Sequence, residues 1–134
     1  LYGNVRQPTP EMLEGIDVLL IDLQDVGTRV YTYGVTMGLC MEAAARSGVK
    51  VVVLDRPNPI GGMHREGNLL RDDHRSFVGR YPLPMRHGLT LGELARYIVS
   101  RCGIPWPAGA RSAFRSRGPT CACRWWLPAR LSGS

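Results

Sequence analysis

The stretch that decides the fold class is IDVLLIDL, residues 16–23. This nearly continuous run of apolar, often branched side chains is typical of a strand that is buried on both faces of a parallel sheet. The run KVVVLD at residues 50–55 has the same character, and residues 31–46 between the two runs carry apolar side chains at helical spacing. Because a strand, a helix and a second strand in this order form a right-handed βαβ unit, we predict an α/β fold in which the two strands are parallel.

Two further segments carry recognisable helix signals. Thr9, which stands directly before a proline, predicts the start of a short helix that ends at Gly15. Thr90 and Glu93 have the spacing of a capping box, and we predict a last helix that begins after Thr90 and runs to Arg101.

Polar side chains follow both predicted strands. The carboxyl ends of parallel strands lie at one edge of the sheet, where open α/β sheets bind their ligands. Each of these side chains alone is more simply explained as a loop or surface residue, but their convergence favours a binding site. A long loop, residues 57–86, follows the second strand, and its length favours a functional role. The candidate binding residues are Asp25, Arg29, Tyr31, Asp55, Arg56 and Asn58.

A nucleotide is the obvious competing ligand for this architecture. Residues 23–28, LQDVGT, hold one glycine where a dinucleotide-binding turn needs G-x-G-x-x-G, and an acid at that place would repel a pyrophosphate. The four cysteines form no CxxC pair and have no histidine at zinc-ligand spacing. We therefore predict no cofactor and no metal site.

Two glutamates and a histidine could carry chemistry. Glu42 and Arg46 form the polar stripe of an otherwise apolar helix, so Glu42 is either one partner of an exposed ion pair or, if the stripe faces the crevice, a half-buried acid. Glu66 lies in the long loop, where a solvated charge is the simpler explanation. His87 stands directly before the last helix, whose N-terminal N–H groups favour an anion.

The net charge of +6 is concentrated at one end of the chain. Residues 1–93 hold ten basic and eleven acidic side chains, whereas residues 94–134 hold seven arginines and no acid. Residues 107–134 mix Arg, Pro, Trp and Cys without a helical or strand period, which fits either a segment that binds single-stranded nucleic acid or a disordered, non-native tail from a shifted reading frame. We favour the tail and expect no nucleic-acid partner. No apolar run approaches the roughly 20 residues that span a bilayer.

A set of short motifs runs through the chain: LYG (1–3), RQPT (6–9), GID (15–17), DVGTR (25–29), YTY (31–33), MEAAA (41–45), LDRPNPIGG (54–62) and RHGLT (86–90). Together these motifs resemble the exo-β-N-acetylmuramidases of glycoside hydrolase family 171, long catalogued as a conserved domain of unknown function. The resemblance runs from residue 1 to about 104, and the combination is specific although no single motif is.

The resemblance implies a Rossmann-like catalytic domain over residues 1–104 that removes terminal N-acetylmuramic acid from the non-reducing ends of peptidoglycan fragments. It also implies a smaller C-terminal domain and a secreted or periplasmic setting, which these residues do not decide. The family's Gly-Pro-Glu-His-Gly stretch, which supplies an acidic site residue, does not occur in this sequence, and we expect the sequence after Trp106 to depart from the family.

We therefore expect an incomplete sheet with an uncovered apolar face, followed by a separate tail over residues 105–134. A chain of this kind should be inactive and poorly stable alone. The alternative function is a non-catalytic, truncated sugar-binding module.

Hydrolysis of a β-muramoside needs an acid at the leaving oxygen, for which we expect Glu42 first and Glu66 second. Asp25 and Asp55 are expected to bind sugar hydroxyls or to orient their neighbours. Muramic acid differs from N-acetylglucosamine by a lactyl carboxylate, so a fixed cation should select it. The candidates for that role are Arg29, Arg56 and His87.

Overall fold

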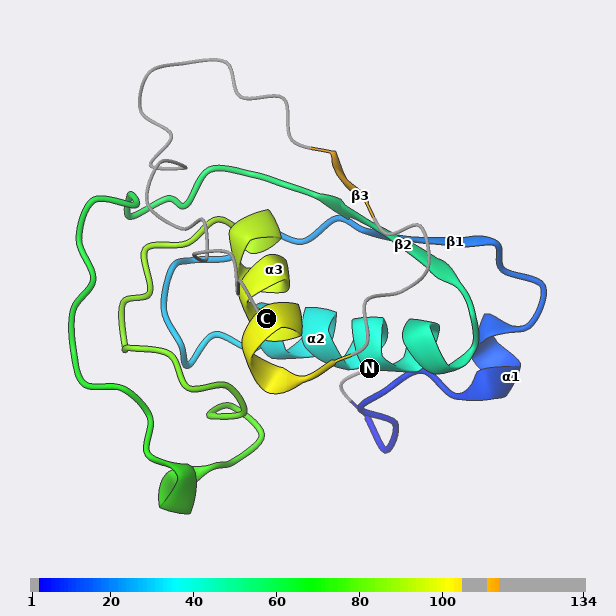
Figure 1. The fold of residues 1–134 in the computed structure, drawn as a ribbon, viewed down its shortest axis with the longest axis horizontal. Helices are drawn as coiled ribbons and strands as arrows, with labels where there is room; N and C mark the ends of the chain where they lie inside the picture. Colours follow the sequence, from blue (N-terminus) through cyan, green and yellow to red (C-terminus); the bar gives the residue numbers. More distant parts are fainter. Residues whose placement is uncertain (1–2, 105–110, 114–134) are drawn as a thin grey trace, which may run out of the picture.

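A computed structural model describes residues 3–104 and 111–113 of the chain, and it has an α/β architecture (Figure 1). Three strands, β1 (Val18–Ile21), β2 (Lys50–Leu54) and β3 (Arg111–Ala113), form a parallel sheet in the order β1-β2-β3. The helices are α1 (Pro10–Leu13), α2 (Tyr33–Arg46), α3 (Leu91–Cys102) and the short 3-10 helix η1 (Asp72–His74). The predicted α/β class and the parallel pairing of the first two strands are confirmed.

The ladder between β1 and β2 runs from Val18 opposite Lys50 to Ile21 opposite Val53. β1 is shorter than the strand predicted over residues 16–23, because only these four positions have a partner in β2. The crossover between the two strands is α2, which packs against β2. This is the βαβ unit that the sequence predicts.

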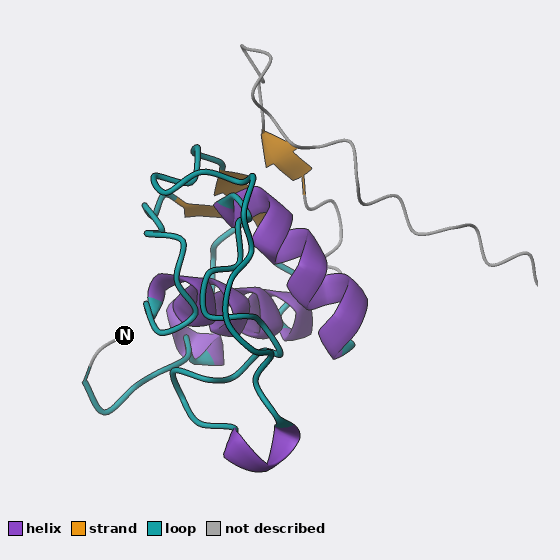
Figure 2. Cartoon of the chain, turned by 90° about the vertical axis from the view of Figure 1, so that its left-hand side faces the viewer, coloured by secondary structure: helices purple, strands orange, loops and turns teal. Residues whose placement is uncertain are grey.

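Helices α2 and α3 both lie on one side of the sheet (Figures 1 and 2). On that side Ile21, Val51 and Val53 are each no more than 5% exposed and belong to the hydrophobic core. On the opposite side Val18 and Leu20 are 42% and 61% exposed. The prediction that the first strand is buried on both faces is therefore wrong, because no described helix crosses the second face. The expected uncovered apolar face is confirmed.

The helix ends follow the sequence signals closely. The Thr90 hydroxyl accepts a hydrogen bond from Glu93 N–H, and the Glu93 carboxylate accepts one from Thr90 N–H, so the predicted capping box of α3 is confirmed. α2 begins at Tyr33 rather than Tyr31, because Tyr31 N–H donates to Thr28 O (3.1 Å) and closes a turn before the helix.

The expected tail, residues 105–134, is described by the structure only at β3, a strand that the sequence did not predict. The remainder of that prediction lies outside the described residues.

Among the helices that the structure describes, none is both long enough and apolar enough to cross a membrane.

Candidate functional site at the carboxyl edge of the sheet

The segment before α3 lies beside the loop that follows β1, at the carboxyl edge of the sheet on the left of Figure 1. Arg29 N–H donates to Met85 O (2.9 Å), and His87 N–H donates to Gly27 O (3.3 Å). These two hydrogen bonds fix the loop after β1 against the start of α3.

On its other side the same segment pairs with the long loop. Arg86 N–H donates to Glu66 O (2.9 Å), and Glu66 N–H donates to Arg86 O (3.1 Å). The amide of Asn58, just after β2, donates to Leu89 O (2.9 Å), and its carbonyl oxygen accepts from Ile60 N–H (3.1 Å). The loops that follow the two strands therefore meet at one edge, as the βαβ pattern predicts.

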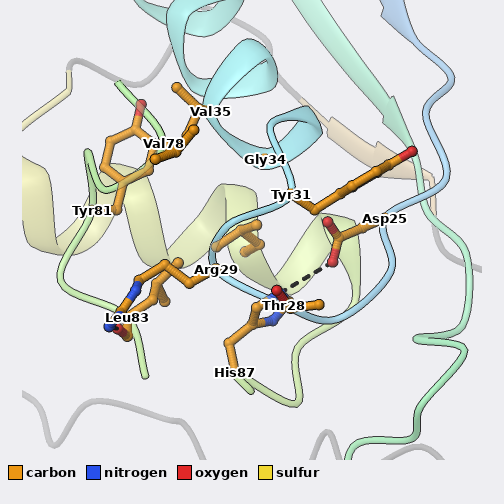
Figure 3. A pocket seen from close by; sticks show the side chains of 11 residues that line it. Asp25, Thr28, Arg29, Tyr31, Gly34, Val35, Val78, Tyr81, Leu83 and His87 are labelled. Carbon is orange, nitrogen blue, oxygen red and sulfur yellow. Dashed lines mark hydrogen bonds and ion pairs between the residues drawn. The ribbon is translucent and has the colours of Figure 1, made fainter. Parts of the chain in front are cut away.

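Asp25 and His87 form a buried pair at the centre of this edge, 4% and 2% exposed (Figure 3). His87 Nε2 lies 3.1 Å from Asp25 Oδ2, which also accepts from Gly27 N–H (2.8 Å). The second ring nitrogen, Nδ1, accepts from Leu89 N–H (3.2 Å). A nitrogen that accepts carries no proton, so in the neutral ring the proton is on Nε2 and is donated to Asp25. Both ring nitrogens are engaged, so in this arrangement His87 has no free N–H for the anion that the sequence led us to expect.

Asp55 caps α3 from the end of β2. Its Oδ1 accepts from Gly92 N–H (2.8 Å), and its Oδ2 accepts from the Thr90 hydroxyl (2.9 Å). A Cβ atom at Gly92 would lie 2.7 Å from Asp55 Oδ2, so this close approach requires glycine. Asp55 therefore orients a neighbouring element, which is one of the two roles expected of it.

The two arginines at the strand ends have different partners. Arg29 Nη1 donates to the backbone carbonyls of Leu83 (2.6 Å) and Asn68 (3.0 Å), which ties the loop after β1 to the long loop. Arg56 donates through Nε (3.1 Å) and Nη2 to Asp22 Oδ1, and both side chains are about half exposed, 49% and 51%. A surface ion pair of this kind adds little stability.

A narrow pocket lies beside the Asp25–His87 pair (Figure 3). The space inside it is about 10 Å³, which is about the room that one water molecule needs. A sugar ring would therefore bind on the outer surface of the edge rather than inside this pocket. The residues with polar side chains that line the pocket are Asp25, Thr28, Arg29, Tyr31, Tyr81 and His87.

Glu42 lies away from the edge, about 14 Å along α2 from Tyr33, the first residue of that helix. Its side chain is 18% exposed, and its carboxylate accepts two hydrogen bonds from Arg80 Nη2, at 3.0 and 3.1 Å. Gln7 Nε2 lies 3.5 Å from the same carboxylate. The exposed ion pair with Arg46 is absent from the described contacts, because Arg80 of the long loop takes the carboxylate instead.

Tyr81 packs beside this ion pair and against α2. A Cβ atom on Gly38 would overlap the Tyr81 hydroxyl, so glycine is needed for the ring to lie so close to the helix. Burial raises the pKa of Tyr81 to about 12, and the charge of Glu42 adds to the increase. We call Glu42, Arg80 and Tyr81 the α2 junction, because they join the long loop to the helix.

Glu66, in contrast, lies at the carboxyl edge. Its Oε2 is 3.1 Å from Arg86 Nη1, and its side chain is 64% exposed whereas that of Arg86 is 26% exposed. Arg86 also donates through Nη2 to Ile60 O. The sequence did not single out Arg86, although its place in the RHGLT motif, next to His87, is a signal that could have found it.

No group of three metal-ligating side chains occurs within residues 3–104 and 111–113.

The fold and the site define an α/β protein whose polar residues gather where parallel strands end, which is the usual place for a ligand in this class. The chain belongs to the family described as exo-beta-N-acetylmuramidase NamZ, N-terminal, whose model matches residues 1–111. The match extends past Trp106, so the expectation that the sequence leaves the family at that residue is wrong. It ends at Arg111, the first residue of β3.

The chain is similar to one curated relative, the peptidoglycan beta-N-acetylmuramidase NamZ of Bacillus subtilis (strain 168). The two are 58% identical over 95 residues, which is 71% of this chain and 23% of the relative. Two crystal structures of DUF1343 family proteins from Bacteroides fragilis NCTC 9343 are also similar. The first has a TM-score of 0.77 and is 49% identical in sequence; the match covers 83% of this chain and 29% of the other protein. The second has a TM-score of 0.69 and is 40% identical in sequence; the match covers 75% of this chain and 28% of the other protein. The chain thus spans about a quarter of the length of these relatives.

Proposed function

We propose that this chain forms part of a glycoside hydrolase that removes terminal N-acetylmuramic acid from peptidoglycan fragments. The 58% identity with a protein named peptidoglycan beta-N-acetylmuramidase supports the substrate class. The structural observation that carries the proposal is the exposed side chain of Glu66, whose carboxylate is paired with the half-buried side chain of Arg86 at the carboxyl edge. This is the edge at which open α/β sheets bind ligands.

Glycoside hydrolysis passes through an oxocarbenium-like state. It commonly needs a proton donor at the leaving oxygen and, near the anomeric carbon, a carboxylate or the acetamido group of the substrate. We assign the carboxylate to Glu66, because its exposed oxygens can reach a sugar at the edge and Arg86 stabilises its charge. This assignment places Glu66 ahead of Glu42, whose carboxylate is held in the α2 junction.

We assign the proton donor to the acidic residue of the family's Gly-Pro-Glu-His-Gly stretch, which does not occur in this sequence. On this proposal the 134-residue chain has no turnover by itself. The side chains that hold the edge in place are Asp25, Asp55, Asn58 and His87. The other candidates for contact with the sugar are Arg29, Tyr31 and Arg56.

The proposal is tested in a chimera, a full-length family member whose aligned segment is replaced by residues 1–104 of this chain. The substrate is a disaccharide with N-acetylmuramic acid at its non-reducing end, and the matched control carries N-acetylglucosamine there. Chromatography should detect free N-acetylmuramic acid and no sugar from the control. Absence of release from the muramic acid substrate, or equal release from both, would contradict the proposal.

A further inference from the structure

Thr28, Arg86 and Glu66 lie side by side across the carboxyl edge. Arg86 is the middle member of two antiparallel bridges, one with Thr28 and one with Glu66. In an antiparallel pair, the side chains of directly opposite residues project to the same face. The hydroxyl, the guanidinium and the carboxylate therefore share one face of this edge, with the guanidinium in the middle.

Two polar atoms of this trio are buried and have no hydrogen-bond partner among the described residues: Thr28 Oγ1 and Arg86 Nε. Folded proteins pair nearly all such groups, because a buried donor without a partner is unfavourable, and each exception needs an explanation. Two exceptions at opposite positions of one bridge can share an explanation, since a ligand oxygen that enters as the exposed Glu66 side chain moves aside can accept hydrogen bonds from both.

We propose that Thr28 and Arg86 form the subsite for the lactyl carboxylate of muramic acid, which replaces Glu66 as the partner of Arg86. A guanidinium binds a carboxylate through paired N–H groups, and Arg86 is held in place by the bond from Nη2 to Ile60 O and by its two backbone bridges. Nε has no partner, and on that side of the guanidinium the paired N–H groups are those of Nε and Nη2, which carries a second hydrogen. Nη1, which contacts Glu66, lies on the other side, so the lactyl carboxylate replaces the charge of Glu66 and not its position. This inference rests on the proposed function.

The ion pair between Glu66 and Arg86 is weak enough for another carboxylate to replace Glu66. It consists of one hydrogen bond of 3.1 Å to a carboxylate that is 64% exposed, and exposed ion pairs contribute little free energy. When the lactyl carboxylate takes the guanidinium, Glu66 is released beside the sugar. N-acetylglucosamine lacks that carboxylate, so it leaves Glu66 paired. Arg86 thereby selects muramic acid both in binding and in the release of the reacting carboxylate.

The arginines predicted from the sequence are less suited to this role. Arg29 directs Nη1 to two backbone carbonyls, and Arg56 directs both Nε and Nη2 to Asp22. Neither has a buried nitrogen without a partner among the described residues, whereas Arg86 does.

The first experiment measures binding to the chimera by calorimetric titration, and the chimera without further substitutions is called the wild type. The probes are N-acetylmuramic acid, its amide, which keeps the lactyl ether without the charge, and N-acetylglucosamine. The wild type should bind the acid at least about tenfold more tightly than the other two. Thr28→Val should reduce this preference, Arg86→Lys should keep part of it and Arg86→Met should abolish it. Thr36→Val, on α2, is the matched control and should keep it.

Thermal unfolding of the same variants separates binding from folding. Thr28→Val removes a buried hydroxyl without a partner, so it should leave the midpoint unchanged or raise it while weakening muramic acid binding. Equal binding of the three probes by the wild type, or no binding of muramic acid, would overturn the subsite. The same holds if Thr28→Val and Arg86→Met keep the preference.

The second experiment uses the chimera and compares kcat/KM for the muramic acid substrate with that for its amide. Arg86→Met should reduce this ratio by about 10- to 100-fold, mainly through kcat, because Glu66 is then free with either substrate. An unchanged ratio in an active chimera would overturn the subsite and leave the proposed function standing. A wild-type chimera that releases no muramic acid would overturn the proposed function itself.

Discussion

Two glutamate–arginine pairs hold the long loop, and they are built in opposite ways. In the α2 junction the side chain of Glu42 is 18% exposed and that of Arg80 is 42% exposed. At the carboxyl edge the side chain of Glu66 is 64% exposed and that of Arg86 is 26% exposed. A carboxylate that is buried with both oxygens bonded contributes to packing, whereas an exposed carboxylate on a fixed guanidinium can exchange its partner. The same pair of residue types therefore fastens the loop at one place and prepares a binding site at the other.

The largest expected effect on stability comes from breaking the α2 junction with Gly38→Ala. The added methyl group would overlap the Tyr81 hydroxyl, so the ring must move away from α2. We expect a loss of about 3 kcal/mol in the free energy of unfolding, measured with urea. Gly48→Ala is the control: it places a methyl group in open space at φ +71° and should cost about 1 kcal/mol. Equal losses for the two variants would show that Tyr81 does not pack as described.

A smaller effect distinguishes the two glutamates directly. Glu42→Gln weakens the bonds of a largely buried carboxylate to Arg80 and should lower the free energy of unfolding by about 1 to 2 kcal/mol. Glu66→Gln changes an exposed ion pair and should stay within about 0.5 kcal/mol of the wild type. Urea unfolding of both variants measures the difference. If Glu66→Gln is the more destabilising of the two, the contrast between the pairs is wrong.

A further effect, confined to alkaline pH, is a loss of stability. The pKa of Tyr81 is raised to about 12 by burial, while an unfolded chain has a tyrosine pKa of about 10. The unfolded state therefore loses this proton first, so the contribution of Tyr81 is complete below about pH 10 and is lost as the pH rises towards 12. Ultraviolet absorbance should show the late titration step, and Tyr81→Phe should remove both the step and the associated slope, whereas Tyr33→Phe should keep them. A Tyr81 that loses its proton near pH 10 would contradict the described packing.

The parts of the fold that could be predicted depend on local signals. The parallel pairing of β1 and β2 follows from two apolar runs joined by a helical segment, and the capping box of α3 follows from Thr90 and Glu93 three residues apart. The edge at which the polar residues gather follows from the same topology. Each of these features needs only the pattern along the chain.

The partners across the long loop could not be predicted in this way. Arg80 bonds to Glu42 across 38 positions, and Arg86 bonds to Glu66 across 20, through a loop without any period. The helical spacing that suggested Arg46 as the partner of Glu42 carries no information about a residue brought in from a loop. The uncovered face of β1 was likewise beyond the pattern of that strand alone, since its apolar run is the same whether one face or both are covered.

The central claim is that Glu66, and not Glu42, is the reacting carboxylate, and it is tested most directly by kcat for the muramic acid substrate in the chimera. Glu66→Gln should reduce kcat by about 100-fold or more, because it replaces a charged group at the reacting centre. Glu42→Gln, assayed well below its unfolding temperature, should keep most of the wild-type kcat. Full turnover by Glu66→Gln together with loss of turnover by Glu42→Gln would contradict the account.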